Sequence, residues 1–180
     1  FYFDIRKDVL YCDPKDSKKR KSTLLLLHII LNSLLKWFAP ILSFTTEEIY
    51  QLVSKKNKSI HLERFLDFPK KFENEKIEKK WDELIKIRDI CNISIEEKRA
   101  SKEIGSSLEA ELQIKLNNKF EQIVNGIDLS ELCITSKAEV NFDDQADVDV
   151  VTKKSSGKKC SVCWKIRIDP CERDPKCQII

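Results

Sequence analysis

The sequence has 180 residues, of which 35% are charged, and a formal net charge of only +3. A chain of this length can bury a core and is expected to fold as more than one small unit. Its longest apolar run, residues 22–35, is interrupted by His28 and Asn32 and is shorter than the roughly 20 apolar residues of a membrane helix, which argues against a membrane protein. We expect no signal peptide. Because the sequence contains no methionine, we also expect it to be a piece of a longer protein.

The near-neutral total hides a strong charge asymmetry along the chain. Residues 1–70 carry 13 basic against 8 acidic side chains, residues 71–150 carry 12 against 19, and residues 151–180 carry 8 against 3. Two basic ends around an acidic middle are typical of a protein that grips a polyanion at two places. A lysine-rich surface that only keeps the protein in solution explains the same charges equally well, so both interpretations stay open at this point.

Residues 1–11 place apolar side chains at positions 1, 5 and 9, which predicts a helix. The linker that follows, residues 12–17, contains Pro14, and Asp16 is the expected N-cap of the next helix. Residues 18–21 are all basic. Because lysine at a helix N-terminus opposes the helix dipole, this cluster favours contact with phosphate over a merely solvated first turn.

Residues 21–38 are dense in leucine and isoleucine, and their polar side chains recur every four residues. Such a narrow polar stripe is typical of a helix that lies deep in a bundle. Pro40 cannot continue the helix, because it lacks an N–H and clashes with the preceding turn. The pair Thr45 and Glu48 has the T-x-x-E spacing of a capping box, which predicts a helix over residues 46–53. Three apolar residues at the corner are expected to face a core: Ile41, Leu42 and Phe44.

The corner itself, W-F-A-P-I-L-S-F-T-T-E-E-I-Y over residues 37–50, resembles the anticodon-binding helical domain of class I aminoacyl-tRNA synthetases. The isoleucine, valine, leucine and methionine enzymes share that domain. Residues 1–11, F-Y-F-D-I-R-K-D-V-L-Y, and the I-H-L run at residues 60–62 before Pro69 are similar to other segments of it. On physical grounds alone, a helix–proline–helix packing element is the simpler interpretation of the corner.

The second half of the chain changes its pattern. Residues 73–100 repeat apolar side chains at three-, four- and seven-residue steps, which predicts a long amphipathic helix. Residues 107–116 alternate strictly between apolar and polar, as a half-buried strand does. With the short elements that follow, we expect a small α+β unit built on an antiparallel sheet. These elements are a helix over 118–124 and strands over 132–135, 138–142 and 147–152.

Four of the seven cysteines gather near the C-terminal end of the sequence. Cys160 and Cys163 form a C-x-x-C pair, whose tight turn lets two thiolates meet one tetrahedral metal ion, and Cys171 and Cys177 supply two further thiols. A short lysine-rich stretch cannot bury a core, so a metal is the natural source of its fold, and zinc is favoured over a redox or disulfide role. The other three are expected to be ordinary, separate buried thiols: Cys12, Cys91 and Cys133.

The C-x-x-C-W run after a basic turn resembles the C-terminal zinc finger of bacterial isoleucyl-tRNA synthetases; the valine and leucine enzymes lack a finger in this place. One departure is that the family's second pair is usually another C-x-x-C, whereas five residues separate Cys171 from Cys177. The resemblance implies an enzyme that activates isoleucine with ATP and esterifies it to tRNA(Ile). The ATP-site motifs His-Ile-Gly-His and Lys-Met-Ser-Lys-Ser are absent, so ATP is expected only in a catalytic domain outside this chain. A monomeric, cytoplasmic enzyme that binds no DNA is implied as well.

These features predict a mainly α protein with a small α+β part. The predicted domains are a helical anticodon-binding domain at 1–70, a linking helix at 71–104, a small antiparallel-sheet junction unit at 105–153 and a zinc finger at 157–180. Two other interpretations stay open. One is a scaffold protein whose helices bind a partner protein, and the other is a DNA-binding zinc module.

The candidate tRNA-binding residues lie at the two basic ends of the chain. Cations there would bind phosphates, which supply affinity, and unstacked bases would supply specificity. Trp164 directly follows the second thiol of the C-x-x-C pair and is either a platform on which a base stacks or an apolar cover for the finger. The cations proposed to contact phosphate are Arg6, Lys7, Lys18, Arg20, Lys158, Lys159 and Arg167.

Overall fold

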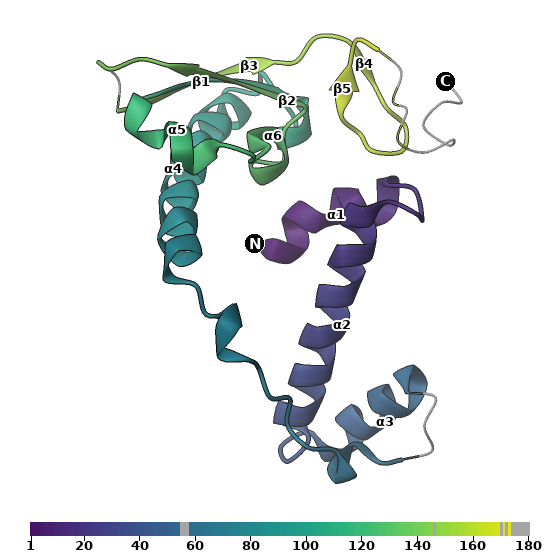
Figure 1. The fold of residues 1–180 in the computed structure, drawn as a ribbon. Helices are drawn as coiled ribbons and strands as arrows, with labels where there is room; N and C mark the ends of the chain where they lie inside the picture. The colour runs from purple at the N-terminus through teal and green to yellow at the C-terminus, as the bar shows by residue number, and fades with distance from the viewer. Residues whose placement is uncertain (55–57, 146, 170, 172, 174–180) are drawn as a thin grey trace. The chain divides into compact units, whose positions relative to one another are not determined.

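The computed structural model describes residues 1–180 except 55–57, 146, 170, 172 and 174–180. It contains two compact units, Lys15–Glu73 and the combination of Phe1–Pro14 with Asn74–Ile180 (Figure 1). The helices are α1 (Tyr2–Cys12), α2 (Lys18–Phe38), α3 (Ser43–Val53), α4 (Glu75–Ala100), α5 (Glu121–Val124) and α6 (Leu129–Leu132). The strands are β1 (Ala110–Leu116), β2 (Lys137–Phe142), β3 (Val148–Lys154), β4 (Lys158–Lys159) and β5 (Ile166–Arg167).

This content confirms a mainly α protein with a small β part. Within the described ranges, none of the helices combines the length and the apolar character needed to cross a membrane. The four predicted domains do not coincide in their limits with the two compact units, because α1 is grouped with residues after 73. The domain limits therefore stay a prediction.

The unit Lys15–Glu73 contains α2, α3 and two 3-10 turns, at Ile60–Leu62 and Lys70–Phe72. α2 begins after Ser17, whose hydroxyl accepts a hydrogen bond from the Arg20 amide at 3.3 Å. The serine therefore caps the helix, and the prediction of Asp16 as the cap is wrong. The core of this unit is small and is formed by Leu31, Leu35, Ala39, Ile49, Tyr50 and Ile60.

The predicted capping box at the proline corner is wrong. α3 begins at Ser43, because the chain re-enters a helix directly after the turn at Pro40, and Thr45 therefore lies inside the helix. Its neighbour Thr46 is buried, and its hydroxyl donates to the Leu42 carbonyl oxygen at 2.9 Å. The Thr46 hydroxyl therefore bonds to a carbonyl of the preceding turn and does not cap the helix.

The apolar residues of the corner are exposed, contrary to the prediction that they face a core. Ile41 is 74% exposed and Phe44 is 92% exposed, and Leu42 is exposed as well. The prediction that α2 is deeply buried is also wrong for the described residues, since most of its leucines are exposed. The physical reason is the size of the unit, in which α3 and one 3-10 turn cover only one side of α2.

Glu47 joins α3 to the turn that follows it. Its carboxylate accepts hydrogen bonds from the Gln51 side chain at 2.7 Å, the Ser59 hydroxyl at 2.9 Å and the Ile60 amide at 2.9 Å. The hydrogen bonds from the Gln51 side chain and from the Ile60 amide are the main reason why the pKa of the Glu47 carboxyl lies below its ordinary value. Glu47, and not the predicted Glu48, is thus the carboxylate that organises this corner.

Replacing Glu47 with alanine is expected to release Ser59–Leu62 from α3 and to lower the protection of the Ile60 amide against hydrogen exchange. Because the folded-state pKa is lowered, this contribution is present above the ordinary glutamate pKa of about 4.3 and is lost as the pH falls through the folded-state value. Protection factors measured between pH 7 and pH 3 test both statements. Thr45→Ala is the control, and equal loss of protection in the two variants would contradict the role of Glu47.

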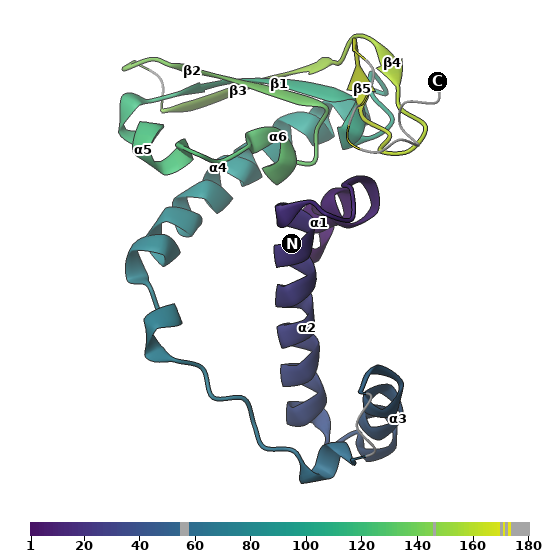
Figure 2. The ribbon, with the colours of Figure 1, turned by 45° about the vertical axis from the view of Figure 1, so that its right-hand side comes forward.

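The larger sheet lies in the second unit and has the order β2-β1-β3. β1 pairs with β3 in the antiparallel sense but with β2 in the parallel sense, so the sheet is mixed and the prediction of an antiparallel sheet is wrong. The parallel pair is possible because α5 and α6 cross over between β1 and β2. α4 runs along the same side of the sheet as α5 and α6 (Figure 2).

The main core lies between α4 and this sheet. Leu84, Ile87, Cys91 and Ile95 form the buried stripe of α4, which confirms the predicted amphipathic helix. β1 buries alternate residues, as predicted, from Ala110 to Leu116. The predicted strand over 132–135 is wrong. Asp128 accepts hydrogen bonds from the amides of residues 130 and 131 and starts α6, so this stretch holds the last residue of α6 and the turn that follows it.

Candidate metal centre

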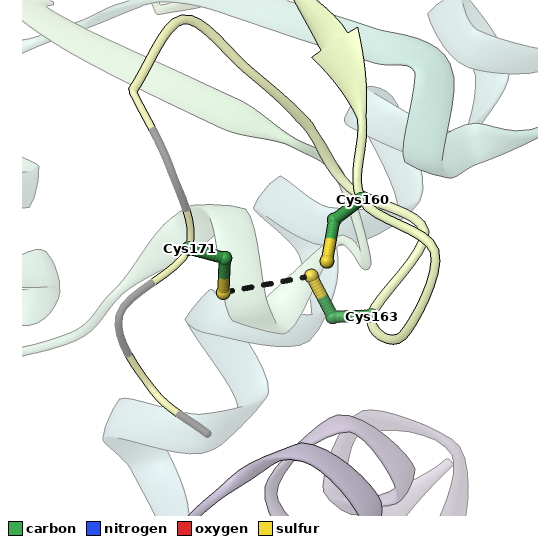
Figure 3. Close-up of side chains that lie close together, drawn as sticks. All are labelled: Cys160, Cys163 and Cys171. Atoms are coloured by element: carbon green, nitrogen blue, oxygen red, sulfur yellow. Dashed lines mark hydrogen bonds between the residues drawn. The ribbon is translucent and has the colours of Figure 1, made fainter. Parts of the chain in front are cut away.

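The C-x-x-C pair lies on a short hairpin that β4 and β5 form. Lys158 pairs with Arg167 and Lys159 with Ile166 in the antiparallel sense. At the turn, the Cys160 amide donates to the Lys165 carbonyl at 3.0 Å, and the Trp164 amide donates to the Cys160 carbonyl at 3.0 Å. The positive φ of Trp164, 60°, closes this turn. The two bonds fold the backbone tightly enough to turn both thiols toward the same side (Figure 3).

Three thiols converge at this hairpin. Cys160, Cys163 and Cys171 are all buried, and their sulfur atoms all lie within 4.8 Å of one another. The Cys163 and Cys171 sulfurs are 4.0 Å apart (Figure 3). Tetrahedral zinc with Zn–S bonds of about 2.3 Å would place its sulfur ligands about 3.8 Å apart, so the arrangement fits a thiolate-bound metal ion. Cys177, the fourth predicted ligand, lies outside the described residues.

The thiol chemistry also favours metal binding over redox catalysis. Burial raises the pKa of the Cys163 thiol above its ordinary value. Reactive C-x-x-C pairs instead hold a thiol whose pKa is lowered. A metal ion overcomes the raised pKa, because it binds the thiolate directly and displaces the proton.

Cys12 also belongs to this cluster, although it lies on α1. Its side chain packs against Cys160, Cys163 and Cys171, and its thiol donates to the Val162 carbonyl at 3.9 Å. Burial, followed by the negative charge of Asp8, raises the pKa of the Cys12 thiol to about 12. The expectation of a separate buried thiol is therefore wrong for Cys12. Cys91 and Cys133 are buried in the core beneath the sheet, as expected, but their thiols meet there, so they are not separate either.

A cavity of about 540 Å³ adjoins the cluster. Its walls come from α1, from Arg88 of α4, from residues near the sheet and from Val162–Lys165 of the hairpin. Trp164 lines this cavity, and its side chain is 60% exposed. The lining of this cavity combines apolar side chains with charged groups at several points.

The predicted phosphate-binding cations fall into three groups. Lys158, Lys159 and Arg167 lie together on the β4–β5 hairpin. Arg6 and Lys7 lie on α1, where Arg6 forms an ion pair with Glu131 at 2.7 Å and Lys7 forms one with Asp4 at 2.9 Å. The third group, Lys18 and Arg20, lies in the first turn of α2, in the other compact unit.

Comparison with known proteins identifies the family. Residues 1–115 match the model of the family described as the anticodon-binding domain of tRNA ligase. The chain belongs to this family. The resemblance recognised at the proline corner is thereby confirmed.

The relatives of this anticodon-binding chain are named isoleucine–tRNA ligases. It is 61% identical to the protein of Pelagibacter ubique over 173 residues, which covers 96% of this chain and 19% of that protein. Identity is 36% over 180 residues for Bartonella henselae, with 94% and 18% covered, and 40% over 182 residues for Rhodopseudomonas palustris, with 92% and 18% covered. The chain thus spans about a fifth of the length of these curated relatives.

Proposed function

We propose that this chain is the tRNA-recognition portion of an isoleucine–tRNA ligase. It would position tRNA(Ile) for ATP-dependent aminoacylation by a catalytic domain elsewhere in the protein. The observation that carries this proposal is the 61% identity over 96% of the chain, which extends well beyond the part that matches the anticodon-binding family. A helical anticodon-binding domain over residues 1–70 and a monomeric, cytoplasmic enzyme that binds ATP only in the catalytic domain belong to the same proposal.

We also propose that the thiol cluster holds one zinc ion. The three converging thiols support this assignment, and Cys177 would be the fourth ligand. When bound, zinc would supply the folding free energy that residues 157–180 cannot obtain from a core of their own. This fixed hairpin would then present Lys158, Lys159 and Arg167 to the tRNA backbone.

The proposed phosphate contacts are supported to different degrees. Lys158 and Lys159 are exposed on the hairpin, and Lys7 and Lys18 are exposed on their helices, so a phosphate can reach each of them. Arg6 already pairs with Glu131 in the described structure, so it would have to share its guanidinium between a carboxylate and a phosphate. Arg20 and Arg167 are half-buried and would contact phosphate only with their ends.

A binding assay with several nucleic acids tests this proposal. The protein should bind tRNA(Ile) more tightly than another tRNA or duplex DNA. The slope of log affinity against log salt should steepen by about 0.7–0.9 for each phosphate that is neutralised. Preference for duplex DNA would favour a DNA-binding zinc module, and a slope near zero with no preference would favour a scaffold protein.

Replacing Trp164 with alanine is expected to weaken tRNA binding by about tenfold or more, because base stacking on an aromatic ring contributes about 1–3 kcal/mol. The exposure of Trp164 and its place in the cavity wall favour its role as a stacking platform and argue against its role as an apolar cover for the finger. Affinity measured by filter binding checks this, with Phe142→Ala as the control, since Phe142 is an exposed aromatic on β2. Loss of zinc or a lower melting temperature with tRNA affinity unchanged would instead make Trp164 a cover.

A further inference from the structure

α1 is held to the rest of its unit at both ends by different parts of the chain. Near its start, the Phe1 ring meets the Trp81 ring of α4 edge-on at 6.3 Å, and Arg6 pairs with Glu131. Near its end, Asp8 and Cys12 contact the segment that carries the metal-binding thiols. The first half of α1 therefore depends on α4 and α6, and the second half depends on the hairpin and the residues after it.

Asp8 is the centre of the second attachment. Its carboxylate accepts two hydrogen bonds from the Arg173 guanidinium, at 2.6 and 2.9 Å, in the paired geometry that makes arginine–carboxylate contacts strong. The ammonium group of the buried Lys165 lies 3.9 Å from the same carboxylate. One carboxylate on α1 thus faces two cations, each of which follows a thiol of the cluster by two residues in the sequence.

Arg173 links this carboxylate to the thiols themselves. It follows Cys171 by two residues, and its guanidinium lies close to the Cys163 and Cys171 thiols. It also lies 3.5 Å from Asp13, just after α1 ends. A zinc ion bound by these three thiolates would already carry a net negative charge, so a guanidinium beside it would neutralise that charge and orient the ligands.

We propose that Asp8 is a positioning residue that couples metal binding at the thiol cluster to the docking of the second half of α1. The proposal rests on the zinc site proposed above. Zinc binding would fix Cys171 and therefore also the nearby Arg173, and Arg173 would hold α1 through its two hydrogen bonds to Asp8. Ile5, Asp8 and Tyr11 of α1 and Val162–Lys165 of the hairpin all line the cavity, so the same contact would also keep these two parts of its wall together.

Hydrogen exchange in the full-length protein tests this coupling. Chelation of zinc should speed exchange of the amides in Val9–Asp13 by at least about tenfold and should leave those of Phe3–Arg6 nearly unchanged. In Asp8→Asn, exchange at Val9–Asp13 should already be fast with zinc bound, and one zinc should still be retained. Asp4→Asn is the matched control, because Asp4 is exposed on the same helix and pairs with Lys7.

The outcomes separate this proposal from the zinc site. If the protein binds no zinc, both are overturned. If one zinc binds and its removal leaves Val9–Asp13 protected, or if Asp8→Asn behaves as Asp4→Asn does, the coupling alone is overturned. Should Asp8→Asn fail to fold, Arg173→Lys tests the same contact, because it keeps the charge and loses the paired geometry; the coupling then predicts fast exchange at Val9–Asp13 with zinc retained.

Discussion

Replacing Cys163 with serine is expected to abolish zinc binding and to unfold the hairpin between residues 157 and 171. The effect should be the largest of any single side chain in this region, since structural zinc contributes about 10–16 kcal/mol in isolated fingers at neutral pH. In the full-length protein, charging of tRNA should fall while isoleucine-dependent ATP–pyrophosphate exchange continues, because that step needs no tRNA. Metal content, Trp164 fluorescence and the two activities are the measurements.

Cys12→Ala provides the matched control for this experiment. Its thiol packs against the same cluster but is not among the three whose sulfurs converge, so this variant should keep one zinc per chain. Loss of zinc in Cys12→Ala as in Cys163→Ser would contradict the proposed ligands. Collapse of pyrophosphate exchange together with charging would contradict a role in recognition alone.

Replacing Gly157 with alanine is expected to disrupt the hairpin as well, for a steric reason. Gly157 has a φ of +127°, and a Cβ atom there would lie 2.2 Å from the Arg167 carbonyl oxygen on the partner strand. The strained backbone and the backbone clash together should cost roughly 2–6 kcal/mol. Zinc affinity and the melting temperature are the measurements.

Gly105→Ala is the control for this steric argument, because the nearest atoms to its Cβ would be the Glu109 carboxylate oxygens at 3.6 Å, an ordinary contact. It should be close to neutral in both measurements. Similar losses of zinc affinity and melting temperature in the two variants would contradict the steric explanation, in which the close approach of the two hairpin strands leaves no room for a Cβ atom at Gly157.

The parts that sequence reasoning predicted well are those with a local pattern. The periodic residues of α4 and the alternation of β1 identify a buried face directly, and C-x-x-C places two thiols on one turn without knowledge of the fold. Cys171 was predicted as a third ligand despite its unusual spacing from Cys177, and the structure brings its sulfur to the pair. Each of these predictions depends on neighbours a few residues away.

The residues that sequence reasoning missed act over long separations or against a stronger local competitor. Asp8 meets Arg173 across 165 positions, and no spacing in the sequence connects them. Asp128 caps α6 and overrides the strand propensity of the residues after it. At the corner, T-x-x-E is a valid capping pattern, but α3 begins at Ser43, directly after the turn at Pro40. Thr45 therefore lies inside the helix and does not cap it.

The most direct test of the central claim is the affinity of the full-length protein for tRNA(Ile) whose anticodon alone has been changed. Protein contacts to unstacked bases contribute about 1–3 kcal/mol each, so we expect the altered tRNA to bind at least about tenfold more weakly. Equal affinity for the two tRNAs with zinc bound would contradict the account.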